Sequence, residues 1–265
     1  MNQTLEKELQ NIHLSYALLD CLLDVFRHMI EAGAEIYRVE ESIERVCRAY
    51  GATRVEAYAT TGQIIVSAEM ADGVTLTDSR RIKTSRTDMA QLDKWNTLIR
   101  HICREPISRE EIERASAEIL QTPVYRAPTF ILANGCVAAF FCLFFGGMSH
   151  GEFFCSFVIG LLVGALIKLM QKTVDNKFMQ RFLGSLLTAV LAFLCKRFGL
   201  IPTVDYVVIG NIMLLIPGVG LTNAIRDLFV GDSITGVLRA IEAVLLALAI
   251  AVGYIFATYL FGGAV

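Results

Sequence analysis

The residues most able to hold a ligand lie where a long apolar run in the second half of the chain is interrupted. Pro217 cannot donate a backbone hydrogen bond, and Gly218 weakens a helix further, so the helix is expected to break there. In a bilayer, the backbone groups freed by such a break must be buried in protein or line a wet cavity. The half-helix after the break favours anionic groups, to which Thr222 and Asn223 could add hydrogen bonds. The alternative is a proline kink whose backbone is satisfied by neighbouring helices.

Two asparagines, Asn134 and Asn211, lie inside other apolar runs. Either could contact a ligand or form a hydrogen bond between helices. Four charged residues follow the break and could act in gating or coupling: Asp227, Asp232, Arg239 and Glu242.

Those charges have two readings. As a gate, they would exchange ion partners with a ligand, and Asp227 or Glu242 could also take a proton for coupling. Alternatively they form a solvated loop with a salt bridge, since Arg239 and Glu242 are three residues apart on one expected helix.

The first half of the chain has one comparable charged segment. Glu35, Arg38 and Glu40 follow Gly33, and they read either as a charged helix face with a docking contact or as a ligand site. The four histidines are dispersed, and neither a nucleophile–base signature nor a glycine-rich phosphate loop is present. We therefore expect no catalytic residues, no metal and no cofactor.

Composition divides the chain into two parts that must position these residues. Up to residue 127 the chain carries 16 of its 24 Lys and Arg and 20 of its 26 Asp and Glu, so the remainder is poor in charge. Neither part is basic enough to suggest nucleic acid. We expect an α+β domain over residues 1–125, followed by a helical polytopic membrane domain over 126–265.

About five transmembrane helices are predicted, because a span needs roughly 20 apolar residues. Their expected ranges are 128–146, 153–171, 182–201, 205–225 and 238–262. The third is the weakest, because Lys196 and Arg197 shorten its apolar run, and it could be re-entrant. The Lys and Arg content of the short loops places the N-terminal domain in the cytoplasm and the C-terminus outside.

Within the first domain, residues 14–50 show helical periodicity interrupted at Gly33. Short alternating runs over 54–60, 63–70 and 74–78 predict an antiparallel sheet with hairpin turns. Residues 87–104 and 108–121 predict two further helices, the second with a capping box at Ser108 and Glu111. The polar first 13 residues do not resemble a signal peptide, and the seven cysteines, which lack a Cys-x-x-Cys pair, read as small buried side chains in a reducing compartment.

The segment Gly33-Ala-Glu-Ile-Tyr-Arg-Val-Glu40 resembles the cytoplasmic signature of the threonine/serine exporter family. The Pro217-Gly218 break, Asn223-Ala-Ile-Arg-Asp227, Gly231-Asp232-x-x-x-Gly236 and Arg239 resemble it as well, in the same order. Full-length members carry a second, shorter membrane unit that this chain lacks, so it resembles the longer subunit of a split, two-component exporter.

This resemblance implies a secondary-transporter subunit in the bacterial inner membrane. Its substrate would be threonine, serine or a dicarboxylate such as succinate, and its partner a smaller membrane subunit. A homo-oligomer stays open, as do the choice of substrate and the coupling ion. The alternative is a membrane-anchored regulatory or hydrolytic domain, but five spans exceed what an anchor requires.

Overall fold

The computed structural model describes residues 14–83, 87–121, 126–173 and 176–261, and within them the chain forms two compact units. The N-terminal unit comprises Met1–Thr122 and Asn223–Arg239, and the apolar unit comprises Pro123–Thr222 and Ala240–Val265. Two helices, α10 (Gly218–Val230) and α11 (Ser233–Phe261), therefore have residues in both units. The segment 223–239, expected with the membrane domain, belongs to the N-terminal unit.

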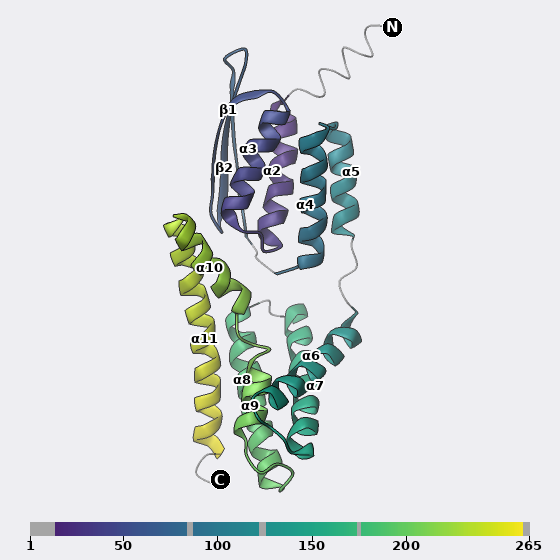
Figure 1. Ribbon diagram of the computed structural model, residues 1–265, viewed down its shortest axis with the longest axis vertical. Helices are drawn as coiled ribbons and strands as arrows, with labels where there is room; N and C mark the ends of the chain where they lie inside the picture. The colour runs from purple at the N-terminus through teal and green to yellow at the C-terminus, as the bar shows by residue number, and fades with distance from the viewer. Residues whose placement is uncertain (1–13, 84–86, 122–125, 174–175, 262–265) are drawn as a thin grey trace. The chain divides into compact units, whose positions relative to one another are not determined.

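The N-terminal unit is α+β, as the sequence predicts (Figure 1). Its helices are α2 (Tyr16–Glu31), α3 (Ile36–Ala49), α4 (Met89–Arg104) and α5 (Arg109–Leu120). The predicted interruption at Gly33 is confirmed: α2 and α3 are separate helices, and Gly33 has a φ of +99°, which a residue with a Cβ rarely adopts. The capping box at Ser108 and Glu111 is also confirmed at the start of α5.

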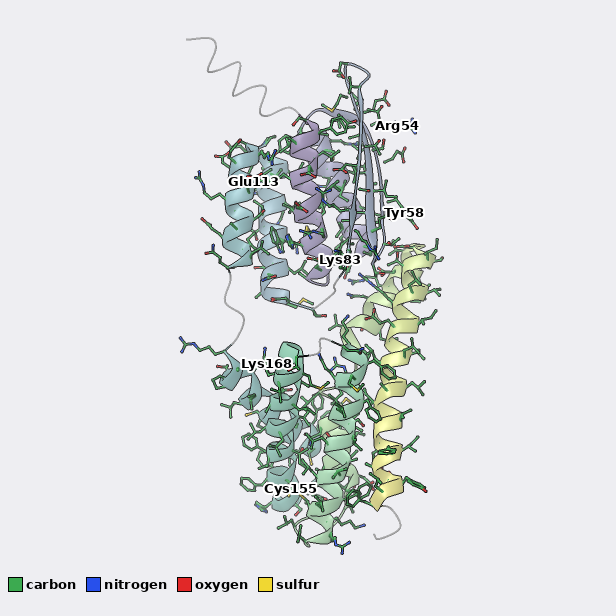
Figure 2. The ribbon with its side chains drawn as sticks, turned by 180° about the vertical axis from the view of Figure 1, so that it is seen from behind. Arg54, Tyr58, Lys83, Glu113, Cys155 and Lys168 are labelled. Atoms are coloured by element: carbon green, nitrogen blue, oxygen red, sulfur yellow. The ribbon has the colours of Figure 1, made fainter. Side chains whose placement is uncertain are left out.

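Three antiparallel strands cover one side of α2 and α3, in the order β1 (Ala52–Ala59), β2 (Gln63–Met70) and β3 (Thr75–Arg81). The alternation of β2 explains the packing, because Ile64, Val66 and Ala68 are buried against the helices. On the opposite face, Arg54 and Tyr58 point away from the helices (Figure 2).

The apolar unit contains α6 (Ala127–Phe144), α7 (His150–Thr173), α8 (Lys177–Arg197) and the short α9 (Asp205–Ile212). Within the residues that the structure describes, four helices are long and apolar enough to cross a membrane: Ala127–Phe144, His150–Gln171, Lys177–Arg197 and Ser233–Phe261. The run expected to be weakest is thus a continuous helix of 21 residues. The span expected over 205–225, with a break at Pro217-Gly218, is divided between α9, which ends at Ile212, and α10, which begins at Gly218.

Close approach of α6 and α7 depends on two glycines of α7, Gly160 and Gly164. A Cβ on Gly160 would lie 2.9 Å from the carbonyl oxygen of Asn134, and a Cβ on Gly164 would lie 3.0 Å from the Asn134 Cβ. Such distances leave no room for a larger side chain. The Gly160-x-x-x-Gly164 pattern is therefore a contact face within this chain.

Candidate functional site

The break between α9 and α10 extends over residues 213–217, further than a kink at Pro217 alone. Pro217 lacks an N–H and disfavours a helical conformation in the residue before it, so the helix cannot continue through Ile216. Tight turns satisfy part of the freed backbone: Leu215 N–H donates to the Ile212 carbonyl at 2.8 Å, and Gly218 N–H donates to the Ile216 carbonyl at 2.9 Å. The interruption is thus an ordered turn closed by its own hydrogen bonds.

Two residues after the break were predicted to bind a ligand. The Thr222 hydroxyl donates to the Gly218 carbonyl of its own helix at 3.0 Å, so in this arrangement it points along α10. Asn223 is half-buried, and its side-chain amide makes no hydrogen bond with the residues that the structure describes. Its amide is therefore the more available of the two.

Asn211, at the end of α9, is fully buried. Its Nδ2 donates to the Val207 carbonyl at 2.9 Å and to the Ser156 hydroxyl of α7 at 3.0 Å. The Ser156 hydroxyl in turn donates to the Ala138 carbonyl of α6 at 3.0 Å. Within the described residues Asn211 Oδ1 has no donor, so this asparagine both joins three helices and presents a free acceptor.

Asn134 behaves differently from Asn211. Its Nδ2 donates to the Phe130 carbonyl one turn earlier in α6, at 2.8 Å, and its backbone faces the glycines of α7. The amide bond stays within α6, so Asn134 does not form the hydrogen bond between helices that was the alternative to a ligand contact; it packs against α7 instead.

The two signature segments meet inside the N-terminal unit. Arg239 at the start of α11 donates to Asp227 Oδ2 of α10 at 2.8 Å and to the Ala34 carbonyl at 3.0 Å. Arg226 of α10 forms an ion pair with Glu35, which also pairs with Arg38 at 2.8 Å. We call these residues, Ala34, Glu35, Arg38, Arg226, Asp227 and Arg239, the charged latch.

Burial sets the electrostatics of the charged latch. The Asp227 side chain is fully buried and that of Arg239 is 11% exposed, whereas Arg226 is half exposed. Loss of solvent raises the pKa of Asp227 above its ordinary value, and the neighbouring Arg239 only partly offsets this. The Asp227–Arg239 pair therefore carries a larger desolvation cost than the Arg226–Glu35 pair, in which Arg226 is half exposed.

Asp232 and Gly236 shape the corner between α10 and α11. Gly231, with a φ of +98°, ends α10, and the Asp232 N–H donates to the Asp227 carbonyl at 3.0 Å, as in a Schellman motif. Asp232 Oδ1 then accepts from the Thr235 N–H and caps α11. A Cβ on Gly236 would lie 2.7 Å from Leu228 Cγ, so only glycine allows this approach.

Glu40 lies in the same unit and ends the signature on α3. Its Oε1 accepts from the Ala59 N–H at the end of β1, at 2.7 Å, which fixes the sheet to the helix. Burial raises the pKa of Glu40, with a further contribution from Asp232. The predicted signature residue is thus a structural tie between α3 and β1.

Glu242 does not pair with Arg239, contrary to one of the expectations. Arg239 is directed to Asp227 and Ala34, while Glu242 pairs with Lys177 of α8 at 3.0 Å. The reason is that each residue finds a nearer partner within its own compact unit. The four predicted charges therefore divide between two places, with only Glu242 in the apolar unit.

Comparison with known proteins agrees with this arrangement. The family model described as "Putative threonine/serine exporter" matches residues 20–261, which includes both signature segments. The chain belongs to the threonine/serine exporter family. No solved structure gives a significant match to the chain.

Relatives within the exporter family are similar over most of this chain. One is the "Probable succinate transporter subunit YjjP" of Klebsiella aerogenes, 27% identical over 92% of this chain and 92% of that protein. Its Escherichia coli counterpart is 26% identical over 88% of this chain and 91% of that protein. The "Probable threonine/serine exporter" of Mycobacterium tuberculosis is 26% identical over 89% of this chain but only 45% of its own length.

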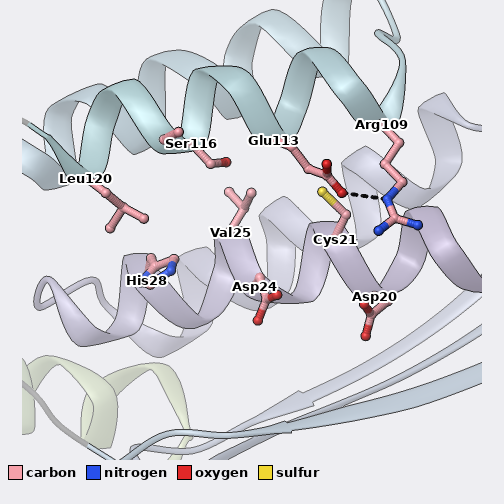
Figure 3. Close-up of a pocket in the computed structure, with 10 residues that line it drawn as sticks. Asp20, Cys21, Asp24, Val25, His28, Arg109, Glu113, Ser116 and Leu120 are labelled. Atoms are coloured by element: carbon pink, nitrogen blue, oxygen red, sulfur yellow. Dashed lines mark hydrogen bonds and ion pairs between the residues drawn. The ribbon is translucent and has the colours of Figure 1, made fainter.

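A pocket of about 260 Å³ between α2 and α5 bears on the hydrolytic alternative (Figure 3). Cys21 and Ser116 point into it, and burial raises the pKa of the Cys21 thiol to about 11. The thiol is thus neutral near pH 7 and a weak nucleophile. Among the described lining residues, His28 contacts Glu31 at 3.1 Å and stacks on Trp95, so it is not a base for that thiol.

Sequence reasoning missed Glu152, which is 2% exposed at the start of α7. Its carboxylate accepts from the Thr203 hydroxyl at 3.0 Å and from the Ser149 N–H at 3.2 Å. A sequence pattern could have identified Glu152, because Ser149-x-x-Glu152 has the spacing of a capping box. Ser156, also missed, lies one turn further along the same face and had no comparable signal.

Proposed function

We propose that this chain is one subunit of a secondary transporter that exports small amino or carboxylic acids across a bacterial inner membrane. Family membership supports export, and the names of the relatives support threonine, serine or succinate as the class of substrate. In this proposal the N-terminal domain is cytoplasmic. The segment α9–break–α10 counts as one pass, giving five in all and an external C-terminus.

The observation that carries the proposal is the break at 213–217 beside the free acceptor of Asn211. Transporters place substrates at interrupted helices, because backbone groups there are available to a ligand. An anchoring helix has no need of such an interruption. Asn211, Pro217, Gly218, Thr222 and Asn223 are accordingly the proposed lining residues, with Asn134 a packing residue beside them.

The charged latch is proposed to gate this path. It joins the Gly33–Glu40 signature to α10 and α11 within the N-terminal unit, and both helices continue into the apolar unit. A substrate or proton that competes for Asp227 or Arg239 would release Ala34 from α11. Movement of the signature segment would then be linked to the helices that carry the break.

A smaller membrane subunit is the proposed partner. This chain covers almost all of a relative whose name calls it a subunit, but 45% of the exporter from Mycobacterium tuberculosis. The word "subunit" in the name of that relative is what supports a second polypeptide. The lipid bilayer is the other expected partner.

Export from vesicles, measured with and without the candidate subunit, tests this proposal. Radiolabelled threonine, serine or succinate should be exported from the vesicles only when both polypeptides are present. Pro217→Ala and Gly218→Leu should lower export sharply at normal levels of inserted protein, and Asn223→Ala should raise the KM. Wild-type rates in the first two variants would reduce the break to a packing feature. Full export by the single chain would refute the need for a partner.

A further inference from the structure

The N-terminal end of α8 carries two polar side chains whose nitrogens are buried and unpaired. Gln180 is 6% exposed, and its Nε2 has no hydrogen-bond partner within the described part of the chain. The Nε of the adjacent Arg181 is buried without a partner as well, and Arg181 forms no ion pair with any described residue.

Two contacts of α8 with α11 show which face of α8 carries Arg181. Lys177 pairs with Glu242 at 3.0 Å, and the Ser185 hydroxyl donates to the Ile250 carbonyl at 2.7 Å. Arg181 lies midway between these two residues of α8, four positions from each, and so shares their face. The residue midway on α11 is Leu246, which is buried and apolar. It therefore cannot neutralise the guanidinium.

Gln180 lies on α8 one turn before Gly184, which packs against the break between α9 and α10. One turn further along α8, a Cβ on Gly184 would lie 3.0 Å from Leu215, which belongs to the break. Another turn on, the Thr188 hydroxyl is fully buried and also lacks a partner among the described residues. Unpaired polar groups thus follow the face of α8 that contacts the interrupted segment.

A guanidinium and an amide nitrogen offer only donors, so their ligand must be an acceptor. Leaving polar nitrogens such as Gln180 Nε2 and Arg181 Nε buried and unpaired in an apolar bundle is costly, and ionisable residues inside membrane segments mark functional sites by default. A carboxylate meets both requirements, because a guanidinium binds it through two parallel hydrogen bonds. We propose that Arg181 and Gln180 bind a carboxylate of the transported acid beside the break.

This assignment rests on the proposed function, and it selects a small acid over a lipid phosphate. Gln180 Nε2 and Arg181 Nε are buried, so a small acid reaches them more readily than the phosphate of a lipid does, and the binding measurement separates the two sources. Glu242 is one turn away on α11 but already has Lys177 as its partner. The site can therefore accept a ligand without disrupting that ion pair.

Binding of radiolabelled succinate and threonine to the purified full chain tests the site without requiring export. Nanodiscs of phosphatidylethanolamine and phosphatidylglycerol are suitable. For whichever acid the wild type binds, Arg181→Gln should weaken binding at least tenfold and Gln180→Leu several-fold. Arg181→Lys should keep part of the affinity, because lysine retains the charge without the planar fork. The matched control is Arg197→Gln, which removes an exposed charge from the other end of α8 and should change nothing.

Three results would overturn the site. The first is wild-type affinity in Arg181→Gln, and the second is a wild type that binds neither acid. The third is loss of co-purified phosphatidylglycerol from Arg181→Gln with acid binding intact, which would identify a lipid phosphate. If the wild type exports with its partner and Arg181→Gln exports with an unchanged KM, the site fails and the proposed function stands. If no acid is exported with the partner present, the proposed function itself fails.

Discussion

Two largely buried arginines, Arg239 and Arg181, have opposite surroundings among the described residues. In the charged latch, Arg239 has a carboxylate and a backbone carbonyl within hydrogen-bond distance. At the start of α8, Arg181 has neither among the described residues. A charge that is satisfied internally holds parts of the protein together, whereas a charge left unsatisfied is free for a ligand. The comparison therefore separates a latch from a binding site.

The largest expected effect comes from removing the satisfied arginine. Arg239→Ala leaves Asp227 buried without a counter-charge, and breaking such a pair costs about 3–5 kcal/mol. The single tryptophan, Trp95, is fully buried in the N-terminal unit, so its fluorescence reports unfolding of that unit. A thermal midpoint close to wild type would show that Asp227 is not buried as described.

The matched control is the exposed half of the latch. Arg226→Ala removes the ion pair between Arg226 and Glu35, in which the Arg226 side chain is half exposed. Exposed pairs contribute about 0–1 kcal/mol. Equal losses of stability in Arg226→Ala and Arg239→Ala would contradict the distinction between a buried and an exposed pair.

A smaller effect is expected where α10 and α11 touch. Gly236→Leu places side-chain atoms against Leu228, and overpacking of this kind costs about 1–3 kcal/mol. Gly62→Ala is the control in the same unit, because a Cβ there meets nothing within 4 Å. Both can be measured from Trp95 fluorescence during urea unfolding, and similar midpoints for the two variants would refute the close contact.

Protonation of Asp227 should give the smallest change in folding stability, but the direction of that change with pH is well defined. Its pKa is raised in the folded protein, so the folded state binds the proton more tightly than the unfolded state, whose pKa is about 3.9. The stability from that proton is fully present below about pH 4 and is lost as pH rises through the folded pKa. Asp227→Asn keeps an oxygen acceptor for Arg239 but removes the titrating group, so it should lack this dependence, and any advantage in stability over wild type should be largest at neutral pH.

Thermal midpoints of the two proteins between pH 4 and 8 check this. The advantage of Asp227→Asn should shrink as the pH falls. An advantage that grows on acidification would mean that Arg239, rather than burial, dominates the pKa of Asp227. The latch would then be a stabilising pair.

Local sequence patterns predicted the elements that local chemistry determines. Gly33 separates α2 from α3, Ser108 and Glu111 start α5, and the alternation in residues 63–70 gives β2. Apolar runs likewise predicted the helices that can span a membrane. These features depend on residues a few positions apart, which a single sequence displays directly.

The pairing of charges could not be read in the same way. Arg239 and Glu242 are three residues apart and suit each other, yet Arg239 binds Ala34, which is 205 positions away. The extent of the break was also underestimated, because a proline identifies where a helix fails but not how far the failure extends. Whether Arg181 is paired depends on every helix around α8, and spacing within α8 contains none of that information.

The close contact of Gly236 with Leu228 has a mechanical consequence. A corner packed this tightly has little freedom to change its angle, so it transmits a rotation instead of absorbing it. Helices α10 and α11, which meet there, would rotate together as one rigid body. A displacement of Ala34 would then reach the break through α10 and the far end of α11 at the same moment, without an intermediate in which only one helix has moved.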